Sequence, residues 1–104
     1  MEVKITNENF ESLKNGELPL VVDFWATWCG PCKAMHPILE QVKERLGDRI
    51  RIIKIDVDKH QALSQQYAVQ AVPTFMIFRK GEMLYRFSGG IARVDMVNLL
   101  ENYL

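Results

Sequence analysis

Two hydrophobic patterns alternate along this chain: short apolar runs, and stripes of apolar residues with helical spacing. Runs of the length typical of β-strands cover residues 3–5, 20–26, 50–56, 74–78 and 83–87. The runs at 20–26 and 50–56 are nearly continuous, as expected for strands that are covered on both faces. The last two runs are close together, which predicts a hairpin whose turn uses the glycine at position 81.

Apolar residues between these runs recur every three or four positions, which predicts helices. The longest stripe starts after position 32 and ends before Gly47, a residue that often terminates helices. Thr6 or Asn7 is expected to cap a first helix, and Asp58 a short one. The apolar positions that define the stripes are Phe10 and Leu13 in the first helix, Met35, Ile38, Leu39, Val42 and Leu46 in the longest, and Val94, Val97, Leu100 and Tyr103 in the last. The element order β-α-β-α-β-α-β-β-α predicts an α/β fold.

Length and charge exclude several classes of protein. A chain of 104 residues forms one domain, residues 1–104, with core enough to fold without metal or disulfide. Thirteen basic and thirteen acidic residues give no net charge and no basic cluster, so neither nucleic acid nor an anionic membrane is expected as a partner. No stretch approaches the roughly 20 apolar residues of a membrane span, and the first residues lack a signal peptide's apolar core. We therefore expect a soluble cytoplasmic protein, provided that no segment precedes this sequence, and a monomer.

The only two cysteines, Cys29 and Cys32, follow the apolar run at 20–26 and begin the longest helical stripe. Unpaired backbone N–H groups and the positive end of the helix dipole favour a thiolate there, so the pKa falls and Cys29 becomes a nucleophile. Cys32, one turn into the helix, is expected to keep a higher pKa until it attacks in turn. Pro31 is tolerated between them, because a first helical turn does not need its missing N–H.

A zinc site is the competing interpretation of the cysteine pair, since this spacing also suits metal ligands. His36 and His60 would have to complete the site. The chain has no second cysteine pair, however, and the two histidines are 24 positions apart. A redox dithiol is therefore the favoured interpretation, and no metal is expected. His36, one turn after Cys32, is then either a residue that tunes the dithiol or an ordinary exposed helix residue.

Three other positions have alternative interpretations from sequence alone. Asp23 interrupts the apolar run and is either buried, with a raised pKa suited to proton exchange, or exposed at a strand bend. Lys54 is more plausibly a solvent-facing strand residue. The Val72–Pro73 peptide bond is expected to be trans, as most X-Pro bonds are.

Motifs spread along the chain resemble the thioredoxin family. The resemblance rests on Pro37, Val72-Pro73-Thr74, Gly81, Gly89 and the segment Phe24-Trp25-Ala26-Thr27-Trp28-Cys29-Gly30-Pro31-Cys32-Lys33. It implies the thioredoxin fold, a central five-stranded mixed β-sheet flanked by four α-helices. It also implies a protein-disulfide reductase in which Cys29 attacks the substrate disulfide and Cys32 resolves the mixed disulfide. Gly30 and Pro31 between the cysteines are similar to the reducing members of the fold.

The resemblance also implies roles for residues around the dithiol. A buried Asp23 would assist deprotonation of Cys32, and Lys54 would pair with Asp23. Pro73 would be cis, and Trp28, Val72, Pro73 and Gly89 would form a surface that binds an extended substrate segment.

No bound cofactor is expected, because the chain has no Gly-rich dinucleotide motif. NADPH would be used by a partner, thioredoxin reductase, and disulfide-containing proteins would be the substrates. Two alternatives remain open: an isomerase or oxidase on the same fold, and a subunit that binds a partner without turnover.

Overall fold

A computed structural model of the chain describes residues 7–104, and within them it contains four helices and four strands. The predicted strand at residues 3–5 and a cap at Thr6 lie outside the described residues. The helices are α1 (Asn7–Lys14), α2 (Gly30–Leu46), α3 (Gln61–Gln66) and α4 (Arg93–Glu101), with a 3-10 turn at Gly47–Arg49. The strands are β1 (Leu20–Trp25), β2 (Arg51–Asp56), β3 (Thr74–Arg79) and β4 (Glu82–Ser88).

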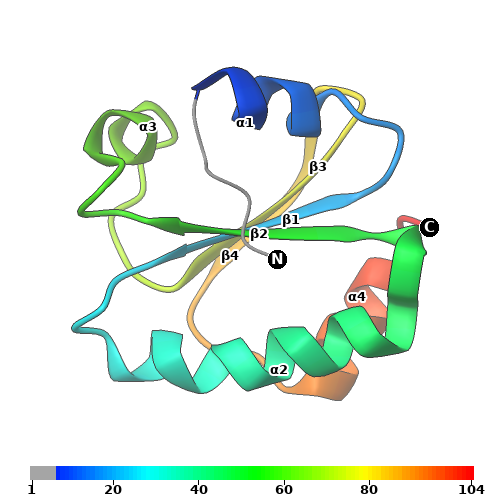
Figure 1. Cartoon of the computed structure of the whole chain (residues 1–104). Helices are drawn as coiled ribbons and strands as arrows, with labels where there is room; N and C mark the ends of the chain where they lie inside the picture. The colour runs from blue at the N-terminus through cyan, green and yellow to red at the C-terminus, as the bar shows by residue number, and fades with distance from the viewer. Residues whose placement is uncertain (1–6) are drawn as a thin grey trace.

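The strands form one mixed sheet in the order β2-β1-β3-β4, in which β1 pairs parallel with β2 and antiparallel with β3. Helices cover both faces of the sheet: α1 and α3 lie on one face, and α2 and α4 on the other (Figure 1). The predicted α/β class is confirmed. Because β1 and β3 are central, their side chains are buried on both faces, as predicted for residues 20–26. The same prediction for residues 50–56 is wrong, because β2 lies at the edge of the described sheet and exposes Arg51 and Lys54.

Two hydrophobic cores sandwich the sheet, and alternate residues of β1 point into each. Val21 packs with the buried stripe of α2 and with α4. Val22 and Phe24 pack with Phe10 of α1 and Leu63 of α3. Four members of the predicted α2 stripe are at most 2% exposed, namely Met35, Leu39, Val42 and Leu46. This packing fixes α2 beneath the sheet, with its first turn just beyond the carboxyl end of β1.

Two further local predictions are wrong, and both errors have a physical cause. Asp58 does not cap α3, because α3 begins at Gln61 and its N-cap residue is His60; the Asp58 carboxylate accepts a hydrogen bond from Trp28. Val94 does not belong to the apolar face of α4: it is 59% exposed, while Met96 is buried. The predicted turn is present, and Gly81 adopts the positive φ of 84° that favours glycine. None of the helices within residues 7–104 has the length and the apolar composition that a membrane span requires.

Candidate active site at the start of helix α2

Cys29 and Cys32 form a disulfide at the first turn of α2. Cys29 is the N-cap residue of the helix, and its Sγ accepts a hydrogen bond of 3.2 Å from the backbone N–H of Cys32. The Cys29 side chain is 5% exposed and that of Cys32 is fully buried, so Cys29 is the sulfur nearer the surface, as predicted. Gly30 and Pro31 between them are exposed. A partner can therefore approach Cys29 over Gly30 and Pro31, while Cys32 stays covered.

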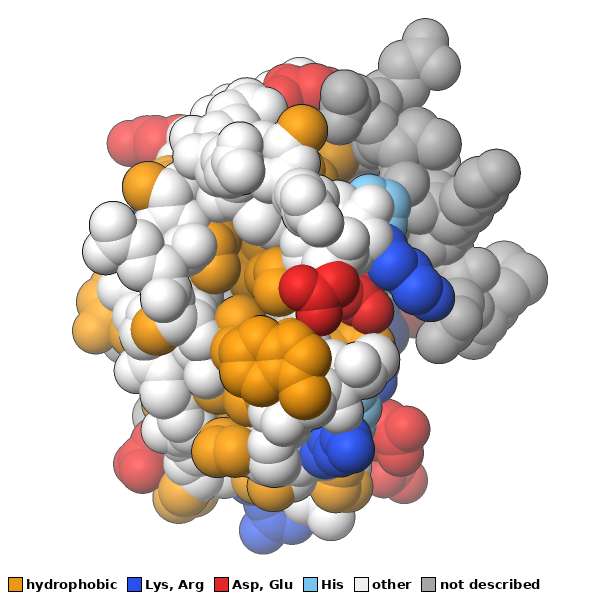
Figure 2. Space-filling view, turned by 90° about the vertical axis from the view of Figure 1, so that its left-hand side faces the viewer, with side chains coloured by type: hydrophobic (Ala, Val, Ile, Leu, Met, Phe, Trp, Pro, Cys, Tyr) orange, Lys and Arg blue, Asp and Glu red, His pale blue; other side chains and the backbone are white. Residues whose placement is uncertain are grey.

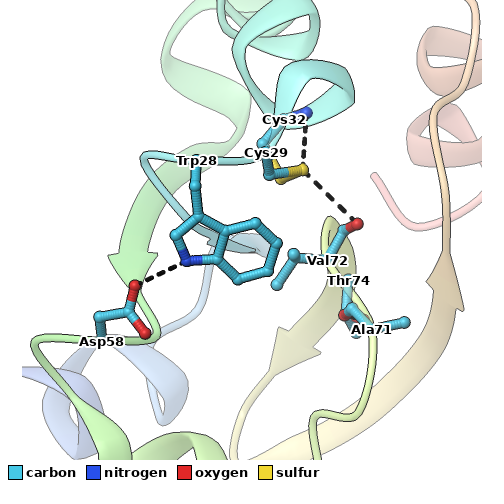
Figure 3. Close-up of a disulfide and its surroundings, with 7 residues drawn as sticks. All are labelled: Trp28, Cys29, Cys32, Asp58, Ala71, Val72 and Thr74. Carbon is cyan, nitrogen blue, oxygen red and sulfur yellow. Dashed lines mark hydrogen bonds between the residues drawn. A yellow bond between two sulfur atoms is a disulfide. The ribbon is translucent and has the colours of Figure 1, made fainter.

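The segment before β3 faces the disulfide across a short gap. The Val72–Pro73 peptide bond is cis, as the family resemblance implies and contrary to the trans bond that sequence alone favours. The Val72 carbonyl oxygen lies 3.6 Å from Cys29 Sγ (Figure 3). A disulfide sulfur carries no hydrogen, so this carbonyl becomes a hydrogen-bond acceptor only when Cys29 is a thiol. The backbone N–H of Gly89 donates to the Pro73 carbonyl at 2.9 Å, which links two of the predicted site residues.

Trp28 stands at the surface beside the disulfide, with 69% of the residue exposed. Its Nε1–H donates to an Asp58 carboxylate oxygen at 2.9 Å, which holds the indole between Asp58 and Val72 (Figure 3). One face of the ring borders a shallow hollow of about 300 Å³, lined by Trp28, Val57, Val69, Gln70, Ala71 and Val72. Figure 2 shows hydrophobic side chains gathered at the middle of this side of the molecule, bordered by charged ones. The exposed indole and the hollow thus lie together beside the disulfide.

Asp23 is fully buried on β1, and among the described residues neither of its carboxylate oxygens has a hydrogen-bond partner. It shares a sheet face with Val21, the face that α2 covers. Burial raises the pKa of Asp23 to about 7, and the positive charge of Lys54 opposes that rise. The prediction of a buried carboxyl with a raised pKa is confirmed, and exposure at a strand bend is wrong.

Lys54 lies opposite Asp23 in the parallel pairing of β1 with β2, and its side chain is exposed. The solvent-facing prediction from sequence is therefore confirmed. Within residues 7–104 no salt bridge joins the two side chains. Lys54 acts on Asp23 through its charge alone.

His36 packs edge-on against Trp25, with ring centroids 4.7 Å apart. Burial lowers the pKa of His36, and the positive charge of Lys54 lowers it further. The uncharged ring is thus the form favoured in this packing. In the part of the chain that the structure describes, no group of three or more His, Cys, Asp or Glu side chains is placed to hold a metal ion.

Sequence reasoning missed Asp58 and the segment 69–71 as parts of this surface. Asp58 is 30 positions from Trp28, and no local pattern announces a hydrogen bond between them. The only sequence feature that could have pointed to Asp58 as part of this surface is its position shortly after a strand-like run. Three segments meet at this end of the sheet: the start of α2, the turn after β2 and the segment before β3. The hollow lies between them.

Comparisons with known proteins point in one direction. A family model described as Thioredoxin matches residues 1–102. The chain is 44% identical over 94 residues to Thioredoxin Y, chloroplastic, of Oryza sativa subsp. japonica, covering 90% of this chain and 56% of that protein. It is 41% identical over 105 residues to Thioredoxin-like protein slr0233 of Synechocystis, covering all of both.

A solved structure described as that of chloroplastic thioredoxin z has a TM-score of 0.85 and 34% identity, covering 98% of this chain and 94% of that one. The chain spans less than two thirds of the length of the Thioredoxin Y proteins of rice and Arabidopsis thaliana that it matches. The matched residues, the mixed sheet and the Cys29–Cys32 disulfide agree with one another. On this evidence, the chain belongs to the thioredoxin family.

Proposed function

We propose that this protein is a protein-disulfide reductase, which donates two electrons from the Cys29 and Cys32 thiols to disulfides in other proteins. One observation carries the proposal: the Cys29–Cys32 disulfide caps α2, with Cys29 toward the surface and the Val72 carbonyl 3.6 Å from its sulfur. The sulfur that would be the nucleophile after reduction thus lies beside a backbone carbonyl that can accept a hydrogen bond. The disulfide is the oxidised product of the reaction described below.

In the first step, the Cys29 thiolate attacks one sulfur of the substrate disulfide. The substrate S–S bond breaks, a Cys29–substrate disulfide forms, and the other substrate sulfur leaves as a thiolate that takes up a proton. The Cys29 thiolate is stabilised by the backbone N–H of Cys32 and by the N-terminal position on α2. This stabilisation makes Cys29 the attacking residue.

In the second step, the Cys32 thiol loses its proton and attacks Cys29 Sγ. The mixed disulfide breaks, the second substrate thiol leaves, and the Cys29–Cys32 disulfide forms, so the substrate has gained two electrons and two protons. Asp23, buried beneath α2 with a pKa of about 7, is the group that we assign to accept the Cys32 proton. Lys54 supports this role by favouring the charged carboxylate, and Gly30 and Pro31 allow the two cysteines their close approach.

Substrates would bind as extended segments along the hollow. The Val72 backbone would offer hydrogen bonds in the manner of an added strand, and Trp28 would contribute apolar surface. Pro73 offers no N–H beside the sulfurs, and Gly89 holds the Pro73 carbonyl. A partner thioredoxin reductase would return two electrons from NADPH to the disulfide, so this chain itself needs no bound cofactor.

We also infer that residues 1–104 form one domain, which acts as a monomer. A dithiol that works as a reductant must be kept reduced, which favours a reducing compartment such as the cytoplasm.

A redox titration of the Cys29/Cys32 couple tests the proposal. The protein would be equilibrated with dithiol buffers of defined potential, followed by fluorescence of Trp25 and Trp28, with the Cys29→Ser/Cys32→Ser variant as control. A reversible two-electron transition at the strongly reducing end of the scale, with reduction of insulin disulfides, is expected. A much more oxidising transition would favour an isomerase or oxidase. The absence of any transition, with partner binding retained by the double variant, would favour a binding subunit.

A further inference from the structure

The segment that faces the disulfide, residues 67–74, is held at three places by the edge strand β4 and by Gly89, the residue that follows it. Near its end, Gly89 donates to the Pro73 carbonyl at 2.9 Å. Also at its end, the hydroxyl of Thr74, the first residue of β3, donates to the Ala71 carbonyl at 2.6 Å and pairs with the Ser88 hydroxyl of β4 at 2.8 Å. At the start, the fastening is made by a single long side chain, that of Arg86.

Arg86 binds two successive backbone carbonyls just beyond the end of α3. One guanidinium nitrogen donates to the Tyr67 carbonyl, and the other donates to the Ala68 carbonyl at 2.8 Å. Arg86 is paired with Met76 in the β3–β4 register, so its side chain leaves the sheet on the face that α1 and α3 cover. Its planar fork suits two adjacent acceptors, and a lysine cannot copy that geometry.

The position of these carbonyls matters because the chain changes direction there. Ala68 has a positive φ of 53°, and from this turn the chain runs along the hollow to Val72. Only four residues separate Ala68 from Pro73. A shift at the start of so short a segment would move residues 69–71, which line the hollow beside Trp28, while the bond from Gly89 still holds Pro73 at the other end.

We propose that Arg86 is a positioning residue for protein substrates, which holds the wall at residues 69–72 in the place where an extended substrate segment can pair with its backbone. This inference rests on the proposed reductase function. Arg86 touches neither sulfur in the described structure, so it acts through the wall alone. A small disulfide, which needs only the sulfur of Cys29, is insensitive to Arg86, whereas a protein disulfide is sensitive.

The test compares Arg86→Met, which keeps the length of the stem and removes the donors, with Arg86→Lys. Arg79→Met is the matched control, because Arg79 also donates to two backbone carbonyls, those of Glu17 and Tyr103, each at 2.9 Å. Arg79 is the last residue of β3, so it lies at the opposite end of this strand from Thr74 and the disulfide. Pre-reduced proteins would react with insulin and with hydroxyethyl disulfide over a concentration series. The midpoint potential and the melting temperature would be measured alongside.

For Arg86→Met we expect the half-saturating insulin concentration to rise about fivefold, with the limiting rate and the rate with hydroxyethyl disulfide within about twofold of the parent. Arg86→Lys should recover part of the loss, and the midpoint potential should stay unchanged. Arg79→Met should lose similar thermal stability and keep its insulin kinetics.

Two results would overturn the positioning role: unchanged insulin kinetics in Arg86→Met, or parallel losses with insulin and hydroxyethyl disulfide. An equal insulin defect in Arg79→Met would also overturn it, because the effect would then follow stability. Failure of the proposed function itself looks different, since the parent protein would then reduce neither disulfide.

Discussion

Asp23 on β1 lies directly opposite Lys54 on β2, on the face of the sheet that α2 covers. The carboxyl group is fully buried while the lysine is exposed, and no salt bridge joins them in the described structure. Lys54 therefore offsets only part of the cost of burying the Asp23 charge. The protein keeps a carboxyl group near the disulfide helix whose protonation changes close to neutral pH.

Asp23→Asn should make folding less sensitive to pH. In the parent, the folded-state pKa of about 7 lies above the ordinary value of 3.8, so the folded state binds the proton more tightly. Parental stability should fall as pH rises from about 4 to about 7, by up to about 4 kcal/mol, and then level off. Asn does not titrate, so the variant lacks this decline.

Denaturant unfolding of both proteins with the disulfide intact, at intervals between pH 4 and 9, checks this expectation. The stability of Asp23→Asn relative to the parent should increase up to pH 7 and then stay constant. A stability difference that does not vary with pH would show that Asp23 does not carry the raised pKa.

Asp23→Ala should slow the resolving step more than substrate binding. The Asp23 carboxylate can accept the Cys32 proton only when it is ionised, so the parental rate of this step should rise with pH through about 7. The variant should lose this rise and resolve the mixed disulfide about 10- to 100-fold more slowly at pH 7. Rapid mixing of the pre-reduced protein with insulin separates the two steps, and equal exchange rates in variant and parent would rule out the role.

Lys54→Gln should raise the pKa of Asp23 further, because the Lys54 charge is what opposes the effect of burial. We expect an increase of up to about one pH unit, since the lysine is exposed and its charge is screened. Carbon NMR of the Asp23 carboxyl group measures the shift. Lys59→Gln, an exposed lysine in the turn after β2, is the control. An unchanged or lower pKa in Lys54→Gln would mean that another group sets the charge balance.

Local sequence patterns correctly predicted helices and strands that pack into one core. They failed where a contact with a residue far away in the sequence determines the position of a side chain. The stripe of α2 from Met35 to Leu46 could be predicted, because each of its positions packs into one core. The role of Asp58 could not be predicted, because its indole partner Trp28 is 30 positions away and α3 begins only at Gln61. Val94 was wrongly predicted to be buried, because helical spacing alone does not show which turns of a helix pack against the rest of the protein.

The residues of the candidate site also fall into two groups, those that sequence alone could predict and those that it could not. Cys29, Cys32 and Asp23 stand out by residue type within one short stretch of sequence. The cis bond before Pro73 followed only from family resemblance, since sequence favours trans. Arg86 looks like an ordinary strand arginine until the fold brings it to the Tyr67 and Ala68 carbonyls.

Trp28→Ala should weaken recognition of protein substrates with little loss of stability. The residue is 69% exposed, so its removal should change the free energy of unfolding by less than about 1 kcal/mol. Reduction of insulin should slow by about fivefold or more, because an exposed aromatic beside the hollow supplies contact area. Val94→Ala, 59% exposed on α4, is the control and should keep parental kinetics. Parental insulin kinetics in Trp28→Ala would remove Trp28 from the binding surface.

Thr74→Val should cost about 1–2 kcal/mol of stability, although the two side chains have nearly the same shape. The buried Thr74 hydroxyl serves the Ala71 carbonyl and the Ser88 hydroxyl, and valine leaves both without it. Ser88→Ala should cost less, because Ser88 is exposed and water can replace its partner. Denaturant unfolding of the three proteins measures the difference, and an equal cost for both variants would contradict this assignment.

The fastening of the wall beside the disulfide uses backbone carbonyls, those of Tyr67, Ala68, Ala71 and Pro73. The side chains of Val69 and Gln70 line the hollow and make none of these bonds. Under the proposed function, mutation at these two positions would therefore change which protein substrates bind while the reaction of Cys29 and Cys32 stays the same. Gene duplication followed by mutation at these positions would then give several reductases with the same chemistry and different substrates.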